Sequence, residues 1–379
     1  MAADSEFEAW FRLLETPGLG AAQARQLLAA FSSPDAVLRA LPSSLRAFVP
    51  GALASAIAGP VPETFGERLR RCQAWFGGGA SRRYLTLGDP EYPPRLLQTA
   101  DPPALLYAEG APALLAQRSL AIVGSRHPTP QGEQNARAFA AALGRAGYGV
   151  VSGLARGIDA AAHEGALMAN AGTVAVLGAG PDLPYPAQNA ALAARIVDNG
   201  GLMLSEYAPG TPAVAANFPR RNRIIAGLSL GTLVVEAALR SGSLITARLA
   251  SEAGREVFAI PGSIHATQSK GCHALIKQGA KLVETAADIL EEIESVAGRS
   301  DAALKASTGN DTFTGEDDGG SPPADPVLRA LGHDPATLDA LLARTGWPAA
   351  DLAAKLLELE LEGRIARMPG GLYLRVVRG

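Results

Sequence analysis

Short apolar runs alternate with helical patterns through the middle of the chain, from Ser119 to about Ile293. Each apolar run is short and almost unbroken, which is typical of strands buried on both faces of a parallel sheet. The runs predict strands at Leu120–Val123, Gly149–Ser152, Thr173–Leu177, Gly201–Ser205, Thr232–Glu236, Val257–Ile260 and Lys281–Val283. Intervening segments such as Gln131–Ala146 and Ile158–Ala169 have helical periodicity. The alternation predicts a doubly wound α/β domain with a mostly parallel sheet, whose ligands bind beyond the carboxyl ends of the strands.

The segments before this block have a different pattern. Up to about Gly79, short helical patterns are separated by Pro and Gly. Within them, Thr16-Pro17-Gly18-Leu19-Gly20 lies between two apolar-periodic runs. This turn resembles a helix–hairpin–helix, which offers backbone amides to a phosphate, but a lone PGLG is a weak signal and a small helical domain with a tight turn is the simpler explanation. The stretch from Tyr84 to Gly110 is rich in proline but apolar, and it predicts a connector that packs on the next domain.

The segments after the block predict a linker and a third domain. Residues 297–325 are mostly Ser, Thr, Gly, Asp and Pro, with too few apolar groups to form a core, so they predict a flexible linker. Residues 325–378 then read as three helices and two short strands around Pro369-Gly370-Gly371, the order of a winged helix-turn-helix. The expected domains are therefore a helical domain at 1–80, the α/β domain at 84–295, the linker at 296–325 and the winged helix at 326–379.

Composition narrows the possible partners and compartments. The chain has 379 residues, 47% hydrophobic content and a formal net charge of −3. Because duplex-DNA binders are usually strongly basic, any nucleic-acid site here must be a local patch. Two cysteines, Cys72 and Cys272, exclude a disulfide framework. No basic start followed by an apolar stretch and no long apolar run are present, so we expect a cytoplasmic protein without membrane contact.

The strongest chemical signal is the segment NFPRRNR at 217–223. It combines Phe218 with three arginines, a pairing that suits a ligand with bases and phosphates. Small, hydroxyl-rich turns follow several predicted strands, and their amides and cations suit phosphate oxygens. Together these features predict a nucleotide or a single nucleic-acid strand as the ligand. The candidate contact residues are Gly124, Ser125, Arg126, Ser152, Gly153, Arg156, Asn217, Phe218, Arg220, Arg221, Asn222, Arg223, Ser241, Gly242, Ser243 and Lys270.

Motifs for catalysis or cofactor binding are not found in the sequence. The sequence lacks GxGxxG after the first predicted strand, Walker GxxxxGK[ST], HExxH and paired CxxC. We therefore expect no cofactor and no metal. Asp159 and His163 lie one helical turn apart and could exchange a proton. No nucleophile accompanies them, so we expect Asp159 to hold the helix start and His163 to make a structural hydrogen bond.

The ordered motifs resemble the DNA-processing protein A family (DprA, also called Smf). They are IVGSR at 122–126, SGLARGID at 152–159, FPRRNRIIAGLS at 218–229, SGSLITA at 241–247 and FAIPG at 258–262. The resemblance implies an extended Rossmann-like domain that binds single-stranded DNA and dimerises. It also implies protection of incoming DNA in natural transformation and loading of the RecA recombinase. Carried over by motif, Arg126 and the Phe218–Arg223 segment are the DNA contacts.

Two features differ from the pattern of the family and of a DNA-reading winged helix. Family members often have a basic residue just before FPxRNR, whereas residues 211–216 here are Thr-Pro-Ala-Val-Ala-Ala, so one phosphate contact is missing. The third helix of the winged helix carries Glu358, Glu360 and Glu362, although a helix in a major groove should be basic. We therefore expect this domain to contact protein, or DNA only weakly.

An enzymatic alternative stays open at this stage. Gly231-Thr232 with Glu236 resembles part of the motif of lysine-decarboxylase-like phosphoribohydrolases. That interpretation requires a glutamate placed over a ribosyl bond, whereas the DNA-binding interpretation requires an open cationic surface.

Overall fold

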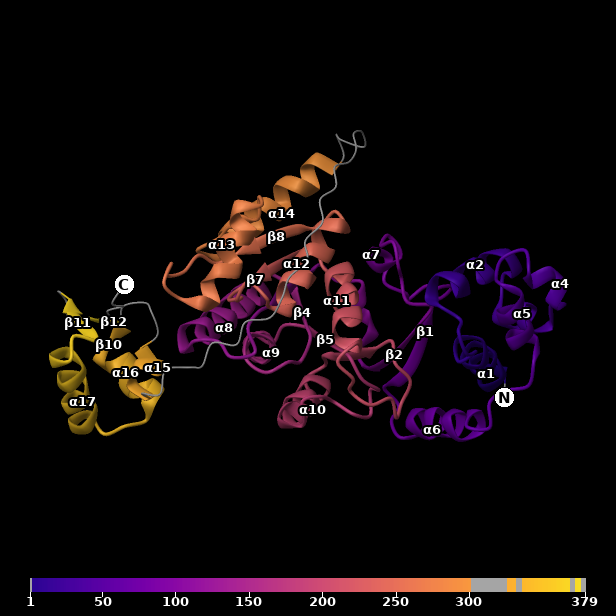
Figure 1. The fold of residues 1–379 in the computed structure, drawn as a ribbon, viewed down its shortest axis with the longest axis horizontal. Coiled ribbons are helices and arrows are strands. Elements are labelled where there is room, and N and C mark those ends of the chain that lie inside the picture. Colours follow the sequence, from indigo (N-terminus) through magenta and orange to yellow (C-terminus); the bar gives the residue numbers. More distant parts are fainter. Residues whose placement is uncertain (1, 301–325, 332–335, 369–371, 376–379) are drawn as a thin grey trace. The chain divides into compact units, whose positions relative to one another are not determined.

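The computed structural model describes residues 2–300, 326–331, 336–368 and 372–375 (Figure 1). Its nine-stranded sheet has the order β1-β2-β6-β5-β4-β3-β7-β8-β9, which confirms the predicted α/β class. The chain divides into two compact units, Met1–Ala116 with Val176–Ile224 and Gln117–Ala175 with Ile225–Gly379. They are called the first and the second unit.

Six helices open the first unit, as the apolar periodicity up to Gly79 predicts. They are α1 (Ala2–Leu14), α2 (Ala21–Phe31), α3 (Pro34–Arg39), α4 (Pro42–Leu45), α5 (Gly51–Ala58) and α6 (Phe65–Gly77). The turn between α1 and α2 contains Gly18 at φ +83°, a conformation that glycine adopts without strain. One buried cluster joins the faces of α1 to α5, and a second, aromatic cluster joins α1 and α6 to the neighbouring strands.

The proline-rich stretch after α6 is more than a connector, so that prediction was incomplete. It contains β1 (Arg82–Thr86), the short helix α7 (Pro94–Leu97) and β2 (Leu105–Gly110). The strands β1 and β2 pair antiparallel, and β2 also pairs antiparallel with β6 (Leu202–Ser205). The prolines lie in the loop between the strands, where they remove no ladder hydrogen bond. Charged residues favour an edge position for β1, where Arg82 pairs across the ladder with Glu109 at 2.7 Å.

The predicted strands of the α/β block are all present, with ends displaced by at most two residues. Besides β6, they are β3 (Ser119–Val123), β4 (Gly149–Ser152), β5 (Thr173–Leu177), β7 (Gly231–Val234), β8 (Glu256–Ala259) and β9 (Lys281–Leu282). In the second unit, β3 pairs parallel with both β4 and β7, and β8 pairs parallel with both β7 and β9. Their carboxyl ends therefore meet at one edge.

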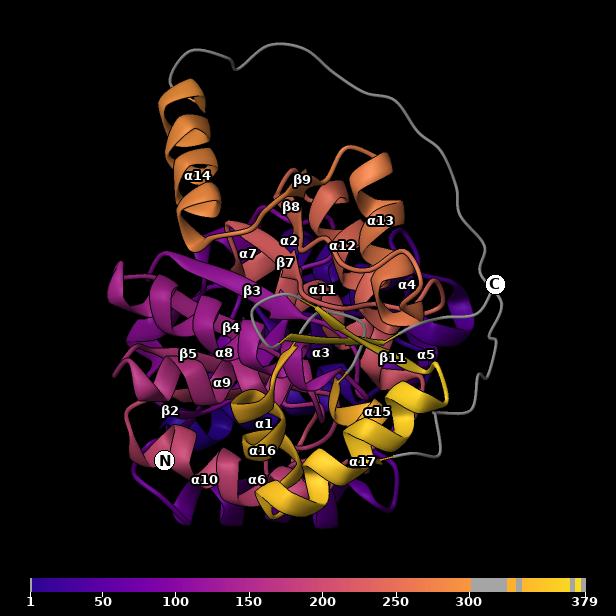
Figure 2. The ribbon, with the colours of Figure 1, turned by 90° about the vertical axis from the view of Figure 1, so that its left-hand side faces the viewer.

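The helices of the second unit cover the sheet. They are α8 (Pro130–Arg145), α9 (Ile158–Met168), α12 (Gly242–Glu252), α13 (Lys270–Lys277) and α14 (Ala286–Ser300). Leu120 and Ile122, which alternate along β3, join a buried cluster with residues of α8, α9 and α14. The helices α8 and α9 lie side by side (Figure 2) because Gly165 has no side chain. A Cβ there would lie 2.3 Å from the Arg137 carbonyl oxygen.

Two further helices and three single turns complete the α/β part. The helices are α10 (Ala190–Asp198) and α11 (Asn217–Leu228), and the turns of 3₁₀ helix are at Pro112–Leu115, Ala187–Asn189 and Thr267–Ser269. The helix α11 begins at the NFPRRNR segment, so the arginines of that motif are helical.

The last elements form the predicted winged helix. They are α15 (Pro326–Leu331), β10 (Ala336–Thr337), α16 (Leu338–Thr345), α17 (Ala349–Leu361), β11 (Ile365–Met368) and β12 (Leu372–Arg375). The strands form a separate sheet in the order β10-β12-β11, and an apolar cluster joins it to the three helices. Most of the expected linker, and Pro369-Gly370-Gly371 between β11 and β12, lie outside the described residues. None of the helices in the described part is long and apolar enough to span a bilayer.

Candidate nucleic-acid interface

Backbone hydrogen bonds connect four turns at the carboxyl edge of the second unit's strands. Ser125 N–H donates to the Glu236 carbonyl (2.7 Å), and the Ser125 carbonyl accepts from Ile158 N–H (3.2 Å). The Ala237 carbonyl accepts from Gly271 N–H (2.7 Å), and Ala237 N–H donates to the Gln268 carbonyl (2.6 Å). The structure thus brings together the turns that contain residues 124–126, 152–157, 236–243 and 262–271, as the sequence predicted.

The turn after β3 is closely packed, and its arginine side chain is exposed. A Cβ on Gly124 would lie 2.7 Å from the Ile158 side chain, so glycine is required there. The Ser125 hydroxyl accepts from His127 N–H (3.1 Å) within the turn. Arg126 is exposed. This leaves the guanidinium, which is always charged, as the group best placed to meet a phosphate.

The turn after β4 is organised around the Asp159 carboxylate. This carboxylate accepts from the amides of Gly153 (3.1 Å) and Ala155 (3.4 Å), which confirms that it holds the start of α9. Leu154 is fully buried at φ +57°, a left-handed conformation that costs a non-glycine residue about 1–3 kcal/mol. The Ser152 hydroxyl is also used internally, on the Ile122 carbonyl (2.6 Å). Arg156 is exposed at the tip of this turn.

His163 makes the structural hydrogen bond that its position predicted. Its Nδ1 lies 2.7 Å from the Thr173 hydroxyl oxygen, and that hydroxyl donates to the Val150 carbonyl (3.0 Å). A hydroxyl has one hydrogen, so Nδ1 must be the donor in the first bond. The imidazole is fully buried and thereby fixed to the strands.

The remaining turns of this edge add an exposed glycine and exposed cations. The Ser241 hydroxyl caps α12 by accepting from Ser243 N–H (3.4 Å), and Gly242 is exposed beside it. Lys270 is exposed at the first position of α13. Arg240, directly before the SGS turn, is exposed as well. It was not predicted, although its position next to a phosphate-compatible turn was a usable signal.

In the first unit, the arginines of the NFPRRNR helix are not equivalent. Arg221 is 4% exposed, and its guanidinium donates to the Val176 carbonyl and to the Asn222 side chain. Arg220 is exposed. The half-buried ring of Phe218 lies against Gly178, where an added Cβ would approach the ring to 2.8 Å. Arg220 is therefore exposed as the sequence led us to expect, Phe218 and Asn222 are half-buried, and Arg221 is enclosed.

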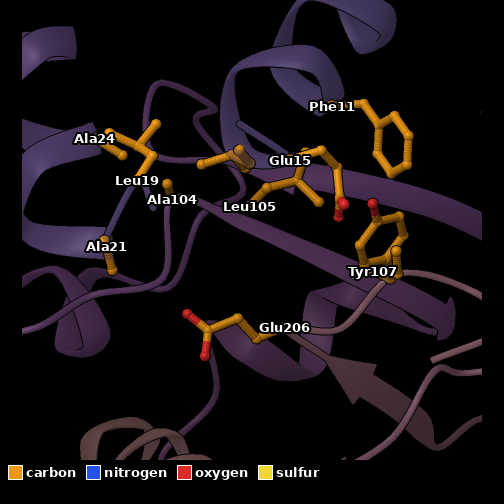
Figure 3. Close-up of a pocket in the computed structure, with 12 residues that line it drawn as sticks. Phe11, Glu15, Leu19, Ala21, Ala24, Ala104, Leu105, Tyr107 and Glu206 are labelled. Atoms are coloured by element: carbon orange, nitrogen blue, oxygen red, sulfur yellow. The ribbon is translucent and has the colours of Figure 1, made fainter. Parts of the chain in front are cut away.

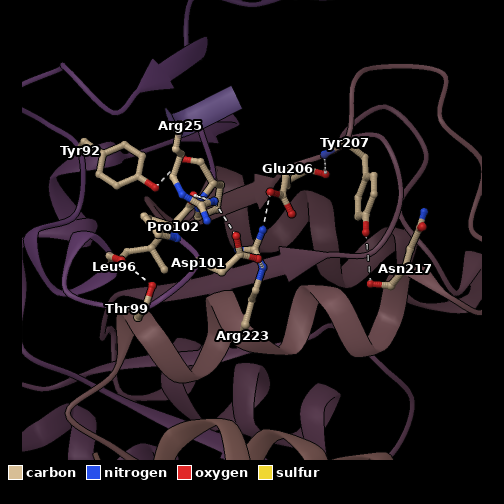
Figure 4. Close-up of polar contacts among 12 residues, drawn as sticks. Arg25, Tyr92, Leu96, Thr99, Asp101, Pro102, Glu206, Tyr207, Asn217 and Arg223 are labelled. Atoms are coloured by element: carbon tan, nitrogen blue, oxygen red, sulfur yellow. Dashed lines mark hydrogen bonds and ion pairs between the residues drawn. The ribbon is translucent and has the colours of Figure 1, made fainter. Parts of the chain in front are cut away.

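Arg223 belongs to an ion-pair network that joins distant parts of the first unit (Figure 4). Its Nε lies 3.0 Å from an Asp101 oxygen, and its Nη2 donates to Glu206. Arg25, on α2, pairs with the other Asp101 oxygen. Burial raises the pKa of the Glu206 carboxyl, and the Arg223 guanidinium acts in the opposite direction. The network holds α11 against the proline-rich loop and α2.

Asn217 and Tyr207 fix the start of α11 (Figure 4). Asn217 is 8% exposed, and its backbone carbonyl accepts from the Tyr207 hydroxyl (3.4 Å). Asn217 is therefore placed to support the helix start rather than to present its own side chain to a ligand.

A cavity of about 180 Å³ lies between the N-terminal helices and β2 (Figure 3). Leu19, Ala24 and Leu105 are among its apolar lining residues, and Glu15 and Glu206 add carboxylates. Glu15 is already paired with Arg68, and its pKa is raised by burial. None of the predicted DNA-contact residues lines this cavity. A small, mostly apolar space with paired carboxylates does not suit a polyanion.

Comparison with known proteins identifies the family to which these motifs belong. The family model of DNA recombination-mediator protein A matches residues 83–294. The chain belongs to the DprA/Smf family of DNA recombination mediators. The model of the DprA winged helix domain matches residues 313–371. The resemblance noted in the sequence is thereby confirmed.

The chain is similar to relatives over most of its length. Protein Smf of Escherichia coli is 46% identical over 287 residues, 76% of this chain and 75% of that protein. DNA processing protein DprA of Streptococcus pneumoniae is 48% identical over 203 residues, 54% of this chain and 71% of that protein. The crystal structure of the S. pneumoniae protein aligns with a TM-score of 0.60 at 38% identity, covering 75% of this chain and 97% of that one.

A second solved structure concerns the single-stranded DNA binding mode of DNA processing protein A from Helicobacter pylori. It aligns with a TM-score of 0.50 at 31% identity, covering 57% of this chain and 96% of that one. Both alignments agree with the α/β fold described above.

The arginines of α11 differ in burial and in ion pairing, so their removal should affect stability differently. Replacing Arg223 with Ala leaves Asp101 and Glu206 without this partner, so the free energy of unfolding should fall by roughly 2–4 kcal/mol, somewhat less than for a fully buried pair. Arg220→Ala is the matched control, and as an exposed substitution it should change stability by less than about 0.5 kcal/mol. Urea denaturation followed by circular dichroism measures both. Equal losses for the two variants would show that the network does not hold α11.

Proposed function

We propose that this protein binds and protects single-stranded DNA and helps to load the RecA recombinase on it during natural transformation or recombination. The observation that carries the proposal is the arrangement of the second unit's turns. Backbone hydrogen bonds fix them at one sheet edge, and their exposed side chains include cations at positions 126, 156, 240 and 270. Such an edge can follow a phosphate backbone without reading its sequence.

The first unit contributes an aromatic and a cation to the same proposal. Phe218 and Arg220 suit a base face and a phosphate, which a single strand presents together and a duplex does not. We keep the full predicted contact set as the proposed interface. Within it, Arg126, Arg156, Arg220 and Lys270 are the proposed direct cationic contacts, whereas Arg221 and Arg223 support the segment from inside.

The position of Glu236 weighs against the phosphoribohydrolase alternative. One carboxylate oxygen accepts from Thr129 N–H (2.9 Å) and the other from the Thr129 hydroxyl (2.5 Å), while that hydroxyl caps α8 by accepting from Gly132 N–H (3.0 Å). A Cβ on Gly132 would lie 2.4 Å from the carboxylate carbon. A glutamate held in this way supports a helix start and is poorly placed to act on a ribosyl bond.

Self-association and location complete the proposal. We infer that the protein acts as a homodimer through its Rossmann-like domain, with RecA as its protein partner, in the cytoplasm. Family membership supports each of these points. We retain the proposed domains at 1–80, 84–295, 296–325 and 326–379.

The winged helix is proposed to contact protein rather than to read DNA. At the end of α17, Glu358 and the C-cap residue Glu362 are exposed beside Leu357 (58% exposed) and Leu361 (82% exposed). Exposed leucines between acidic residues suit a protein surface better than a phosphate backbone.

The proposal predicts a clear preference for single strands. At moderate salt the protein should bind oligo-dT more tightly than a duplex of the same length, because stacking requires unpaired bases. Fluorescence anisotropy across a salt titration measures both affinities. Equal affinity for the two forms, or steady release of free base from nucleoside monophosphates, would favour a different function.

Arg126 should contribute directly to affinity. Removing one charge-assisted contact with Arg126→Ala should cost about 1.5–3 kcal/mol of binding, without a change in melting temperature. The matched control is Arg145→Ala, because Arg145 is exposed at the other end of α8, away from the carboxyl edge. If Arg126→Ala lowered melting temperature and affinity together, its role would be structural.

Truncation after Ser295 should leave a folded protein that still binds single-stranded DNA. Ile293, the last residue of α14 in the buried cluster, is retained, and few apolar groups follow it before the winged helix. Circular dichroism and anisotropy test folding and binding. A loss of affinity as large as that of Arg126→Ala, with folding intact, would give the winged helix the primary DNA contacts.

A further inference from the structure

Two loops of the first unit form a fixed surface beside the start of α11. Gly180 N–H donates to the Thr211 carbonyl (2.9 Å), and Gly210 N–H donates to the Asp182 carboxylate (2.7 Å). A Cβ on Gly180 would lie 2.7 Å from the Ala208 carbonyl oxygen, so the loops approach too closely for any other residue. The loop after β5 is therefore held in place by the loop after β6.

This surface presents an exposed aromatic ring next to Phe218. The rings of Tyr185 and Phe218 have centroids 5.5 Å apart at an angle of 44°. Phe218 is backed by Gly178, whereas Tyr185 is 51% exposed. In the same two loops, Leu183 and Val214 are each 45% exposed. An aromatic ring supported on one side and open on the other is the arrangement on which a planar ligand stacks.

A cation accompanies the rings. Arg220 is exposed on α11, two residues after Phe218. Burial raises the pKa of Glu206 and of Tyr207, and the Arg220 charge acts on both in the opposite direction. An exposed aromatic ring beside a cation suits a base and the phosphate that follows it. A purely apolar partner would offer no group to pair with the Arg220 charge.

We propose that Tyr185 is a DNA-contact residue on which one base of a single strand stacks, with Phe218 supporting its ring and Arg220 meeting the adjacent phosphate. The inference rests on the proposed function and adds a residue that the motifs did not indicate. Tyr185 lies far from FPRRNR along the chain, and only folding brings the two rings together.

The test compares ring removal with ring retention. Tyr185→Ala should weaken binding to oligo-dT by about 5- to 100-fold, the range for loss of one stacked base. Tyr185→Phe keeps the ring and should bind within about twofold of the unchanged protein, because stacking does not need the hydroxyl. Leu41→Ala is the control for loss of an exposed apolar side chain, since Leu41 is 69% exposed elsewhere in the same unit. It should leave affinity unchanged.

An abasic oligonucleotide separates stacking from phosphate binding. On it, Tyr185→Ala should have no effect, whereas Arg220→Ala should weaken binding to both oligonucleotides. An equal effect of Tyr185→Ala on both would overturn the stacking role. Ultraviolet crosslinking of the unchanged protein to an oligonucleotide containing 5-iodouracil, mapped by mass spectrometry, should mark the peptide with Tyr185. Absence of that crosslink while other peptides are marked would also overturn it.

Failure of this inference is distinguishable from failure of the proposed function. If the unchanged protein does not bind oligo-dT, the proposed function falls, and this inference falls with it. If binding is present and depends on Arg126 but not on Tyr185, only the role of Tyr185 is wrong.

Discussion

The peptide unit around Ser125 is the interaction on which the candidate interface depends. Its N–H donates to the Glu236 carbonyl and its carbonyl accepts from Ile158 N–H, so one residue joins three turns. Such close approach requires glycine on both sides of the contact. A Cβ on Gly124 would meet Ile158, and one on Gly157, at φ +75°, would lie 2.5 Å from the Ser125 carbonyl oxygen. The turns are therefore fixed by backbone contacts, and their exposed cationic side chains do not need to hold them in place.

The same division between supporting and presenting groups applies to the NFPRRNR helix. A guanidinium removed from water must be paired, and Arg221 and Arg223 are paired with a carbonyl, an amide and two carboxylates. Because these two guanidinium groups are paired within the fold, their charges are not presented to a ligand as the sequence motif had suggested. Arg220, by contrast, is exposed on the same helix as Phe218. The ring of Phe218 packs against Gly178, and the loop that carries Tyr185 is hydrogen-bonded to the loop after β6. The helix thus uses similar residues for two physical purposes.

The overall negative charge is compatible with a polyanionic ligand because charge is distributed unevenly. Many acidic groups are paired within the fold, as Glu15 is with Arg68 and Glu206 with Arg223, or accept hydrogen bonds within it, as Glu236 does from Thr129. At the carboxyl edge of the second unit, the turns instead expose Arg126, Arg156 and Lys270. A local cationic edge on an acidic protein would give salt-sensitive binding without general affinity for duplex DNA.

The sequence by itself determined the α/β class, the strands of the parallel block and the winged helix, because buried strands require short unbroken apolar runs. It also determined which turns meet, since parallel strands place their carboxyl ends at one edge. It did not reveal β1 and β2, because the prolines between these two strands led us to expect a connector and not an antiparallel edge of the sheet. Only the tertiary structure decided which arginines are accessible, because partners such as Asp101 and Val176 lie far from Arg223 and Arg221 along the chain. Burial and pairing are properties of neighbours in space, so identical residues within one motif acquire different roles, and Tyr185 becomes visible only beside Phe218.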